Sequence, residues 1–257
     1  VFGQFSGLHI SGIKDLSFLA DFPKLLYLEI DGHNKFPDMR PLEGLSNLRG
    51  LVVWSPGSGI DFSRFPELEV SQGDWHPDHR HLDACQELRR LHFWGFHPRS
   101  NDLSDLKGLT RLEDLSVIQT KITSLDGVEA LEDLRYLRVS HAPKLTSVDA
   151  LGHATCGIRE IELAVAQKIR SYQPLAKIPR LRRLKLSGCA PMSHLKWTAG
   201  MDALDFLSFV NTDVKDGDLA PLLRLPKLRY VGTMDRKHYS HKANALNETF
   251  RDRHKIT

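Results

Sequence analysis

The chain has 257 residues, of which 41% are hydrophobic and 26% are charged, as in a folded protein rather than a disordered one. The formal net charge is only +3 and charges of both signs alternate, which argues against nucleic acid or anionic lipid as the partner. No stretch approaches the roughly 20 apolar residues of a membrane helix. The three cysteines, Cys85, Cys156 and Cys189, are odd in number and far apart, which favours reduced thiols. We therefore expect a cytoplasmic protein with no membrane segment.

A nine-residue pattern, LxxLxxLxL, recurs along the chain. Its copies are LSNLRGLVV (45–53), LTRLEDLSV (109–117), LEDLRYLRV (131–139), IPRLRRLKL (178–186) and MDALDFLSF (201–209). The residue that opens each LxL pair falls at Leu8, Leu28, Leu51, Leu68, Leu91, Leu115, Leu137, Ile161, Leu184, Leu207 and Val231. Apart from the first step and a 17-residue step from Leu51 to Leu68, the spacing is 22 to 24 residues, which predicts a repeat protein.

Each repeat combines two periods of hydrophobic residues. The LxL pair alternates at period 2, which predicts a short strand with one buried face. The preceding stretch, as at Leu103, Leu106 and Leu109, has period 3, which suits a 3₁₀ turn better than an α-helix. Stacked coils of this kind pool their leucines into one core. We expect about eleven coils over 1–234.

An array of paired helices is the alternative repeat architecture. It requires two helices of period 3.6 in each unit, and usually a longer repeat. Four prolines share one place in the repeat, before the apolar position that leads into the strand: Pro23, Pro66, Pro179 and Pro226. A fixed φ angle and a missing N–H are tolerated in a turn there, so the prolines favour the strand-and-turn coil.

Over residues 5–234 the units resemble the leucine-rich repeats of bacterial internalin-type proteins, with their LxxLxLxxN strand segment. The resemblance implies an α/β fold: a right-handed horseshoe-shaped solenoid with a parallel β-sheet on the concave face and 3₁₀, short helical or irregular segments on the convex face. One departure concerns the asparagine that bonds corner backbone groups in that family. Its place is taken by His33, Phe96, Thr120, Ala142, Ala166, Cys189 and Thr212, so we expect less uniform coils.

The repeat is least regular at 55–88, where we expect a loop or a kink. This stretch contains His76, His79, His81 and Cys85, which could supply zinc ligands. Their spacing matches no standard zinc site, and a solvated polar loop explains them equally well, so we predict no metal and no cofactor. Residues 235–257 follow the last repeat and are interpreted as a C-terminal cap and charged tail, with a short helix that places Leu246 and Phe250 on the last coil.

Residues beside the inward leucines should point outward from the concave sheet. Exposed aromatic and arginine side chains are typical of protein interfaces, so we predict a partner-binding surface there. The predicted residues are Tyr27, Glu29, Trp54, Glu67, Glu69, Arg90, His92, Trp94, Asp114, Tyr136, Arg138, Glu160, Glu162, Arg183, Lys185, Phe206 and Tyr230. Because acidic groups outnumber basic ones in this set, a partner with a basic patch facing the Glu67/Glu69 and Glu160/Glu162 strands is the hypothesis.

No nucleophile elbow, phosphate-binding loop, HExxH or GxGxxG motif occurs, so we expect no enzyme activity. The function that we predict is a protein-binding scaffold, monomeric when free, and within that class an inhibitor or immunity-type protein that neutralises a cognate toxin or enzyme. The alternatives are a substrate-recognition arm or adhesin-type fragment of a larger protein and, less favoured, nucleic-acid binding through the basic tail.

Overall fold

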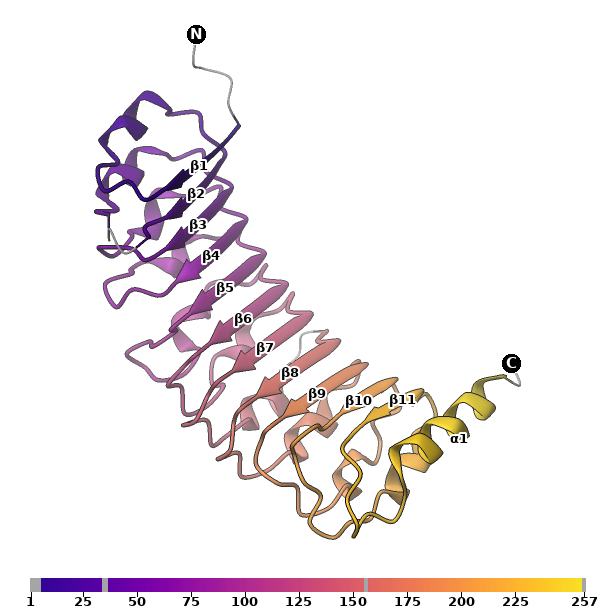
Figure 1. Cartoon of the computed structure of the whole chain (residues 1–257). Coiled ribbons are helices and arrows are strands. Elements are labelled where there is room, and N and C mark those ends of the chain that lie inside the picture. The colour runs from indigo at the N-terminus through magenta and orange to yellow at the C-terminus, as the bar shows by residue number, and fades with distance from the viewer. Residues whose placement is uncertain (1–5, 34–36, 155–156, 256–257) are drawn as a thin grey trace.

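The computed structural model describes residues 6–33, 37–154 and 157–255 as a curved solenoid with its strands on the concave side (Figure 1). Within these residues eleven strands form one parallel sheet in chain order, as the repeat predicts. The strands are β1 (Gly7–Ser11), β2 (Tyr27–Asp31), β3 (Gly50–Trp54), β4 (Val70–Asp74), β5 (Arg90–Trp94), β6 (Asp114–Ile118), β7 (Tyr136–Ser140), β8 (Glu160–Ala164), β9 (Arg183–Ser187), β10 (Phe206–Ser208) and β11 (Tyr230–Gly232).

Short 3₁₀ helices return the chain along the convex side, where the period-3 leucines predict them (Figure 1). They are η1 (Ser17–Asp21), η2 (Arg40–Gly44), η3 (Phe62–Arg64), η4 (Leu82–Ala84), η5 (Ser104–Leu106), η6 (Val128–Ala130), η7 (Asp149–His153), η8 (Gln173–Lys177), η9 (Lys196–Thr198) and η10 (Ala220–Arg224). The leucines of strands and 3₁₀ helices form one continuous buried cluster from Ile10 to Phe250. Cys156 lies outside the described residues.

The register of the fourth coil differs from the sequence prediction. Ser71, not Leu68, pairs with Leu51 on one side and Leu91 on the other, so the predicted 17-residue step is wrong. The two real steps are of 20 residues each, from 51 to 71 and from 71 to 91. The stretch 55–88, expected to be irregular, contains η3, β4 and η4.

Small residues on the inner face of β4 make this coil hard to recognise. Ser71 and Gly73 stand where other strands have larger apolar residues such as leucine, isoleucine, valine or phenylalanine. Aromatic rings fill the core beside them: Phe93 lies 6.3 Å from Phe62 and 5.4 Å from Trp75, measured between ring centroids. Volume that the strand lacks is therefore supplied by neighbouring segments, which preserves close packing.

Hydroxyl and thiol groups replace part of the missing asparagine ladder. Thr120 Oγ1 donates to the carbonyl of Phe96 at 2.6 Å, and Thr212 Oγ1 donates to that of Leu186 at 3.2 Å. Cys189 Sγ lies 3.2 Å from the carbonyl of Leu163. Ala142 and Ala166 have no side-chain polar group for this task, so the corner hydrogen bonds differ from one coil to the next.

A residue in the left-handed region follows most strands and turns the chain out of the sheet. Glycine occupies this corner at Gly12, Gly95 and Gly188, whereas Val165 takes it with φ of 51°. A β-branched side chain is strained there, since left-handed backbone costs L-residues about 1–2 kcal/mol.

We expect Val165→Gly to raise the free energy of unfolding by about 0.5–1 kcal/mol, because the relieved strain exceeds the entropy cost of glycine. Val210 is the matched control: it is 36% exposed against 38% for Val165 and does not have a positive φ. Val210→Gly should lower the free energy of unfolding by a similar amount. Denaturant titration measures the change in the free energy of unfolding of each variant relative to the wild type. If both changes had the same sign, backbone strain at Val165 would be refuted.

The last coil is covered by helix α1 (Ala243–Lys255), seen at the C-terminal end of the solenoid in Figure 1. Leu246 and Phe250 are buried, as the sequence predicts. The Asn247 side chain accepts from the Val231 N–H at 2.8 Å and donates to the Val231 carbonyl at 2.9 Å. Asn247 thus bonds to β11 as a further strand would, which satisfies its edge.

Candidate functional site

Outward side chains of the eleven described strands form the concave surface. All but two of the predicted binding residues lie on it. They are Tyr27 and Glu29 on β2, Trp54 on β3, Arg90, His92 and Trp94 on β5, Asp114 on β6, Tyr136 and Arg138 on β7, Glu160 and Glu162 on β8, Arg183 and Lys185 on β9, Phe206 on β10 and Tyr230 on β11.

Glu67 and Glu69 are the two exceptions, and their placement on a strand is wrong. Glu67 lies in the turn before β4, and Glu69 directly precedes that strand. The Glu69 carboxylate lies 3.8 Å from Arg49 at the edge of the sheet. The reason is the register of β4, whose outward residues are Val70, Gln72 and Asp74, which the LxL pattern did not reveal.

A shallow hollow of about 480 Å³ lies over β1–β4, and we call it the N-terminal hollow. The ring of Tyr27, which is 50% exposed, lies against Gly50, where a Cβ atom would come within 2.6 Å of it. Val52 and Val70 continue the apolar floor. Glu29 at its rim lies 3.1 Å from His9 Nδ1.

A second concavity of about 260 Å³, the central pocket, lies over β3–β7. Its aromatic walls come from Trp54, Trp94 and Tyr136, three of the predicted residues. Burial, with the charge of Glu162 next, raises the pKa of Tyr136 to about 12, so its phenol stays protonated. The remaining lining includes Arg138 and His92, which were predicted, and Gln72, Ser116 and Ile118, which were not.

Most charges on β5–β9 are paired inside the protein. His92 Nε2 lies 3.0 Å from Asp114 Oδ1. Arg138 Nε lies 3.1 Å from Glu162 Oε1, in an ion pair that lacks the alignment of a hydrogen bond. Lys185 Nζ lies 2.7 Å from Glu160 Oε1.

The four glutamates that were predicted to face a basic partner do not form an open acidic surface. Glu160 is also 3.4 Å from Arg183, and Glu162 is 3.6 Å from Lys185, so three cations surround this pair of glutamates. Glu67 and Glu69 lie off the sheet. A basic patch on the partner therefore has no support from these four residues.

Two aromatic rings extend the surface toward its C-terminal end. The Arg183 guanidinium lies 4.3 Å from the centroid of Phe206, and Phe206 stacks on Tyr230 at 5.0 Å. Tyr230 remains 46% exposed. The stack holds these side chains in place before any partner arrives, which lowers the entropy cost of binding.

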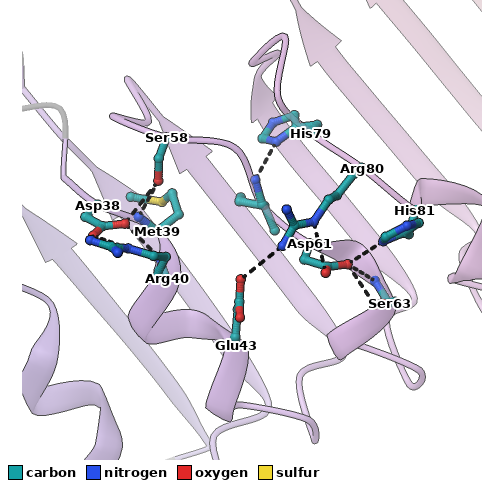
Figure 2. Close-up of polar contacts among 11 residues, drawn as sticks. Asp38, Met39, Arg40, Glu43, Ser58, Asp61, Ser63, His79, Arg80 and His81 are labelled. Carbon is teal, nitrogen blue, oxygen red and sulfur yellow. Dashed lines mark hydrogen bonds and ion pairs between the residues drawn. The ribbon is translucent and has the colours of Figure 1, made fainter.

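Hydrogen bonds link the histidine-rich stretch to residues of the preceding coil (Figure 2). His79 Nδ1 accepts from the Ile60 N–H at 3.0 Å, and His81 Nδ1 lies 2.8 Å from Asp61 Oδ1. Arg80 and Ser63 also donate to Asp61, whose pKa these hydrogen bonds hold well below its usual range. Among the described residues no group of three or more histidines, cysteines or carboxylates could hold a metal ion.

The two described cysteines are buried and free. Burial raises the pKa of Cys85 to about 12 and that of Cys189 to about 11. Both are therefore protonated thiols at neutral pH and poor nucleophiles. No helix of the described residues is long and apolar enough to cross a membrane.

The parallel sheet, the 3₁₀ convex side and the leucine core define a leucine-rich-repeat solenoid. No known family model and no curated protein matches the sequence. The fold is similar to that of an internalin (inlF) from Listeria monocytogenes, with 18% identity and a TM-score of 0.64 over 89% of this chain and 73% of that one.

Two further similar structures contain bound partners. The ectodomain of GASSHO1/SCHENGEN3 from Arabidopsis thaliana, in complex with CASPARIAN STRIP INTEGRITY FACTOR 2, is 13% identical with a TM-score of 0.62, over 89% of this chain and 28% of that one. The TLR13–ssRNA13 complex gives 17% identity and a TM-score of 0.63, over 90% of this chain and 41% of that one. This chain thus spans less than half of either of those chains, and the likeness concerns the fold.

Proposed function

We propose that this chain is a non-catalytic scaffold that binds another protein on the concave face of its sheet. The central pocket carries the proposal, because the aromatic side chains of Trp54, Trp94 and Tyr136 line it together. Trp94 is 41% exposed and Tyr27, in the adjacent hollow, 50%. Rigid aromatic side chains beside pockets are the groups that contribute most to protein interfaces.

Charge on this surface also favours a protein over nucleic acid. All three cations of β7 and β9 are engaged by Glu160 and Glu162, so they do not form a continuous basic stripe. In the C-terminal helix Arg253 donates to the carbonyls of Leu223 and Leu225. A phosphate backbone would need several free cations along one face.

The narrower proposal is an inhibitor or immunity-type protein that covers a cognate toxin or enzyme in a reducing, cytoplasmic compartment. Its support is the combination of one wide binding face with the buried, free thiols of Cys85 and Cys189. A recognition arm of a larger protein is the competing role. A toxin encoded beside this chain would favour the first role, and a surface anchor in a longer form of the chain would favour the second.

The test is affinity capture from the source cells with the wild-type chain, a Trp54→Ala/Trp94→Ala/Tyr136→Ala variant and a control variant. The control, Ile13→Ala/Val165→Ala, removes exposed apolar side chains outside the strands. Captured proteins are identified by mass spectrometry, and their affinity is then measured with purified components.

We expect the aromatic variant to bind the captured protein at least about 100-fold more weakly, since interface aromatics cost about 2 kcal/mol or more each when truncated. The control should bind as the wild type does. Equal affinity of all three chains, each with an unchanged thermal unfolding midpoint, would place binding elsewhere and contradict the proposal.

A further inference from the structure

A polar cavity of about 320 Å³ lies on the loops that follow β8, β9 and β10, separate from the concave surface. Three of its lining side chains are basic or can become so: Arg170, His194 and Lys215. Tyr172 and Trp197 form its inner wall. No carboxylate lines it.

Backbone pairing between neighbouring coils brings these groups together. The Met192 N–H donates to the Asp213 carbonyl and the Lys215 N–H donates to the Met192 carbonyl, both at 2.8 Å. Lys215 is thereby held beside the segment that carries His194. Arg170 comes from the preceding coil, where its N–H donates to the Thr146 carbonyl at 3.0 Å.

The two strong cations of the cavity are not neutralised by the protein. Arg170 and Lys215 are exposed, and within the described part of the chain neither has a carboxylate within ion-pair distance. By contrast, Arg182 of the next coil lies 2.6 Å from Asp205. Two unpaired cations on one cavity without a carboxylate create a local positive potential that favours an anion.

Buried polar atoms without partners provide a second, independent observation. Trp197 is only 6% exposed and lines the cavity, yet its Nε1–H has no hydrogen-bond partner. His194 Nδ1 is likewise buried without one. An orphaned buried polar group is costly unless a ligand or water satisfies it.

Trp197 itself is unusual at its place in the coil. Trp197 is the second residue of η9. In the flanking coils the second residue of the 3₁₀ helix is a proline, Pro174 in η8 and Pro221 in η10. Its ring stacks on Tyr172 at 5.9 Å, and Tyr172 Oη is fixed by donating to the Ala190 carbonyl at 2.6 Å. The Tyr172 side of the inner wall is therefore rigid. The residue pattern of the repeat does not require a tryptophan at this position.

We propose that this cavity binds a small oxyanion of the phosphate type, either free or as the phosphate group of a small ester. Arg170 and Lys215 supply the charge and the first hydrogen bonds to the oxygen atoms. The buried Nε1–H of Trp197 would add a further donor after a small movement of the inner wall, and His194 would donate or accept according to its tautomer. The volume is near the lower end of ligand-binding pockets, which suits a phosphate with few further atoms. Anion binding in this cavity is independent of partner binding at the concave face.

Calorimetric titration with inorganic phosphate, sulfate and glycerol 3-phosphate, at constant ionic strength set with sodium chloride, tests the proposal. The test variant is Arg170→Gln/Lys215→Gln. The control, Lys168→Gln/Lys227→Gln, removes the same charge from exposed lysines that do not line the cavity.

We expect phosphate or its ester to bind the wild type and the control equally, and the test variant at least about tenfold more weakly, because charge-assisted hydrogen bonds are lost. The stronger of the two ligands identifies the source of the phosphate. Trp197→Phe keeps a ring but removes the Nε1–H, and it should weaken binding, whereas Trp75→Phe, which removes the other orphaned indole, should not.

Two results would overturn the proposal. The first is the absence of heat above the chloride background for all three ligands. The second is equal weakening in the test and control variants, since that would show attraction to net charge rather than to this cavity. Circular dichroism and the unfolding midpoint of each variant show whether it is folded. The first result is measured on the wild-type chain alone, so it does not depend on the folding of any variant.

Discussion

Replacing Gly73 with alanine is expected to lower the free energy of unfolding by about 4 kcal/mol, the largest effect of any single methyl group considered in this fold. Gly73 has φ of 140°, a conformation that L-residues rarely adopt. An added Cβ would lie 1.8 Å from the Val53 carbonyl oxygen, on the strand that pairs with it. Backbone atoms cannot yield as a flexible side chain can, so β3 and β4 would have to separate.

Gly95→Ala is the matched control, because Gly95 also has a positive φ, of 66°, but nothing lies within 4 Å of an added Cβ. It should cost about 1 kcal/mol, from backbone strain alone. Urea titration of the two variants separates strain from steric overlap. A Gly73→Ala variant no less stable than Gly95→Ala would show that β3 and β4 are not held this closely.

The same substitution should also weaken partner binding. Trp54 is the last residue of β3 and Trp94 is the last residue of β5, and β4 lies between them. Displacing β4 would therefore change the distance between two walls of the central pocket. The irregular fourth coil, which has the weakest repeat signature, is the one that positions the aromatic surface.

Much of this architecture follows from the sequence, because the LxL pair and the period-3 leucines each report a local conformation. The two hydrophobic periods correctly predict ten of the eleven strands in the described chain. They also predict nearly every outward-facing residue on those strands. The helix that buries Leu246 and Phe250 is also predicted, from two apolar residues on one helical face.

The fourth strand could not be located by the same reasoning. Its inner positions hold Ser71 and Gly73, so alternation of apolar residues is lost, and Leu68 offers a false match. The small size of Ser71 and Gly73 is compatible with a packed core because the rings of Phe93 and Trp75 fill the space beside them. Compensation between distant segments is a tertiary effect that no local pattern reports.

Ion pairing across coils is the second feature that the sequence could not supply. Glu160 and Lys185 are 25 residues apart, yet their side chains meet at 2.7 Å. A count of acidic and basic residues along the strands therefore overestimates the free acidic charge. Such pairs depend on side-chain conformation, which repeat spacing does not determine.

Acidification from pH 7 to pH 4 is expected to destabilise the fourth coil through His79. Its ring lies among Phe62, Trp75 and Phe93, at centroid distances of 5.3, 5.3 and 5.8 Å. Burial lowers the pKa of His79 to about 4. A backbone hydrogen bond to Asp74 opposes this shift, and the charges of His76 and Asp78 lower and raise the pKa, respectively.

The sign of this change in the free energy of unfolding depends on whether the folded or the unfolded state binds the proton more readily. An unfolded histidine takes up a proton near pH 6.5, whereas folded His79 does so only near pH 4. Between these values the unfolded state holds more protons, so the free energy of unfolding falls as pH falls, by about 3 kcal/mol in total. The stabilising contribution of neutral, buried His79 is fully present above pH 6.5. Protonation of Nδ1 would also remove the acceptor for the Ile60 N–H.

Denaturant titrations at several pH values between 7 and 4 measure this loss, and His79→Gln isolates it from the carboxylates that titrate at the lower end. The variant should be less stable than the wild type at pH 7, but its stability should change by about 2–3 kcal/mol less over this range. His141→Gln, at an exposed histidine, should keep the wild-type pH dependence. Parallel curves for wild type and His79→Gln would mean that His79 is not the group that links this coil to pH. Since Phe93 immediately precedes Trp94, the same loosening should reach the central pocket, and affinity for a concave-face partner should fall over the same pH range.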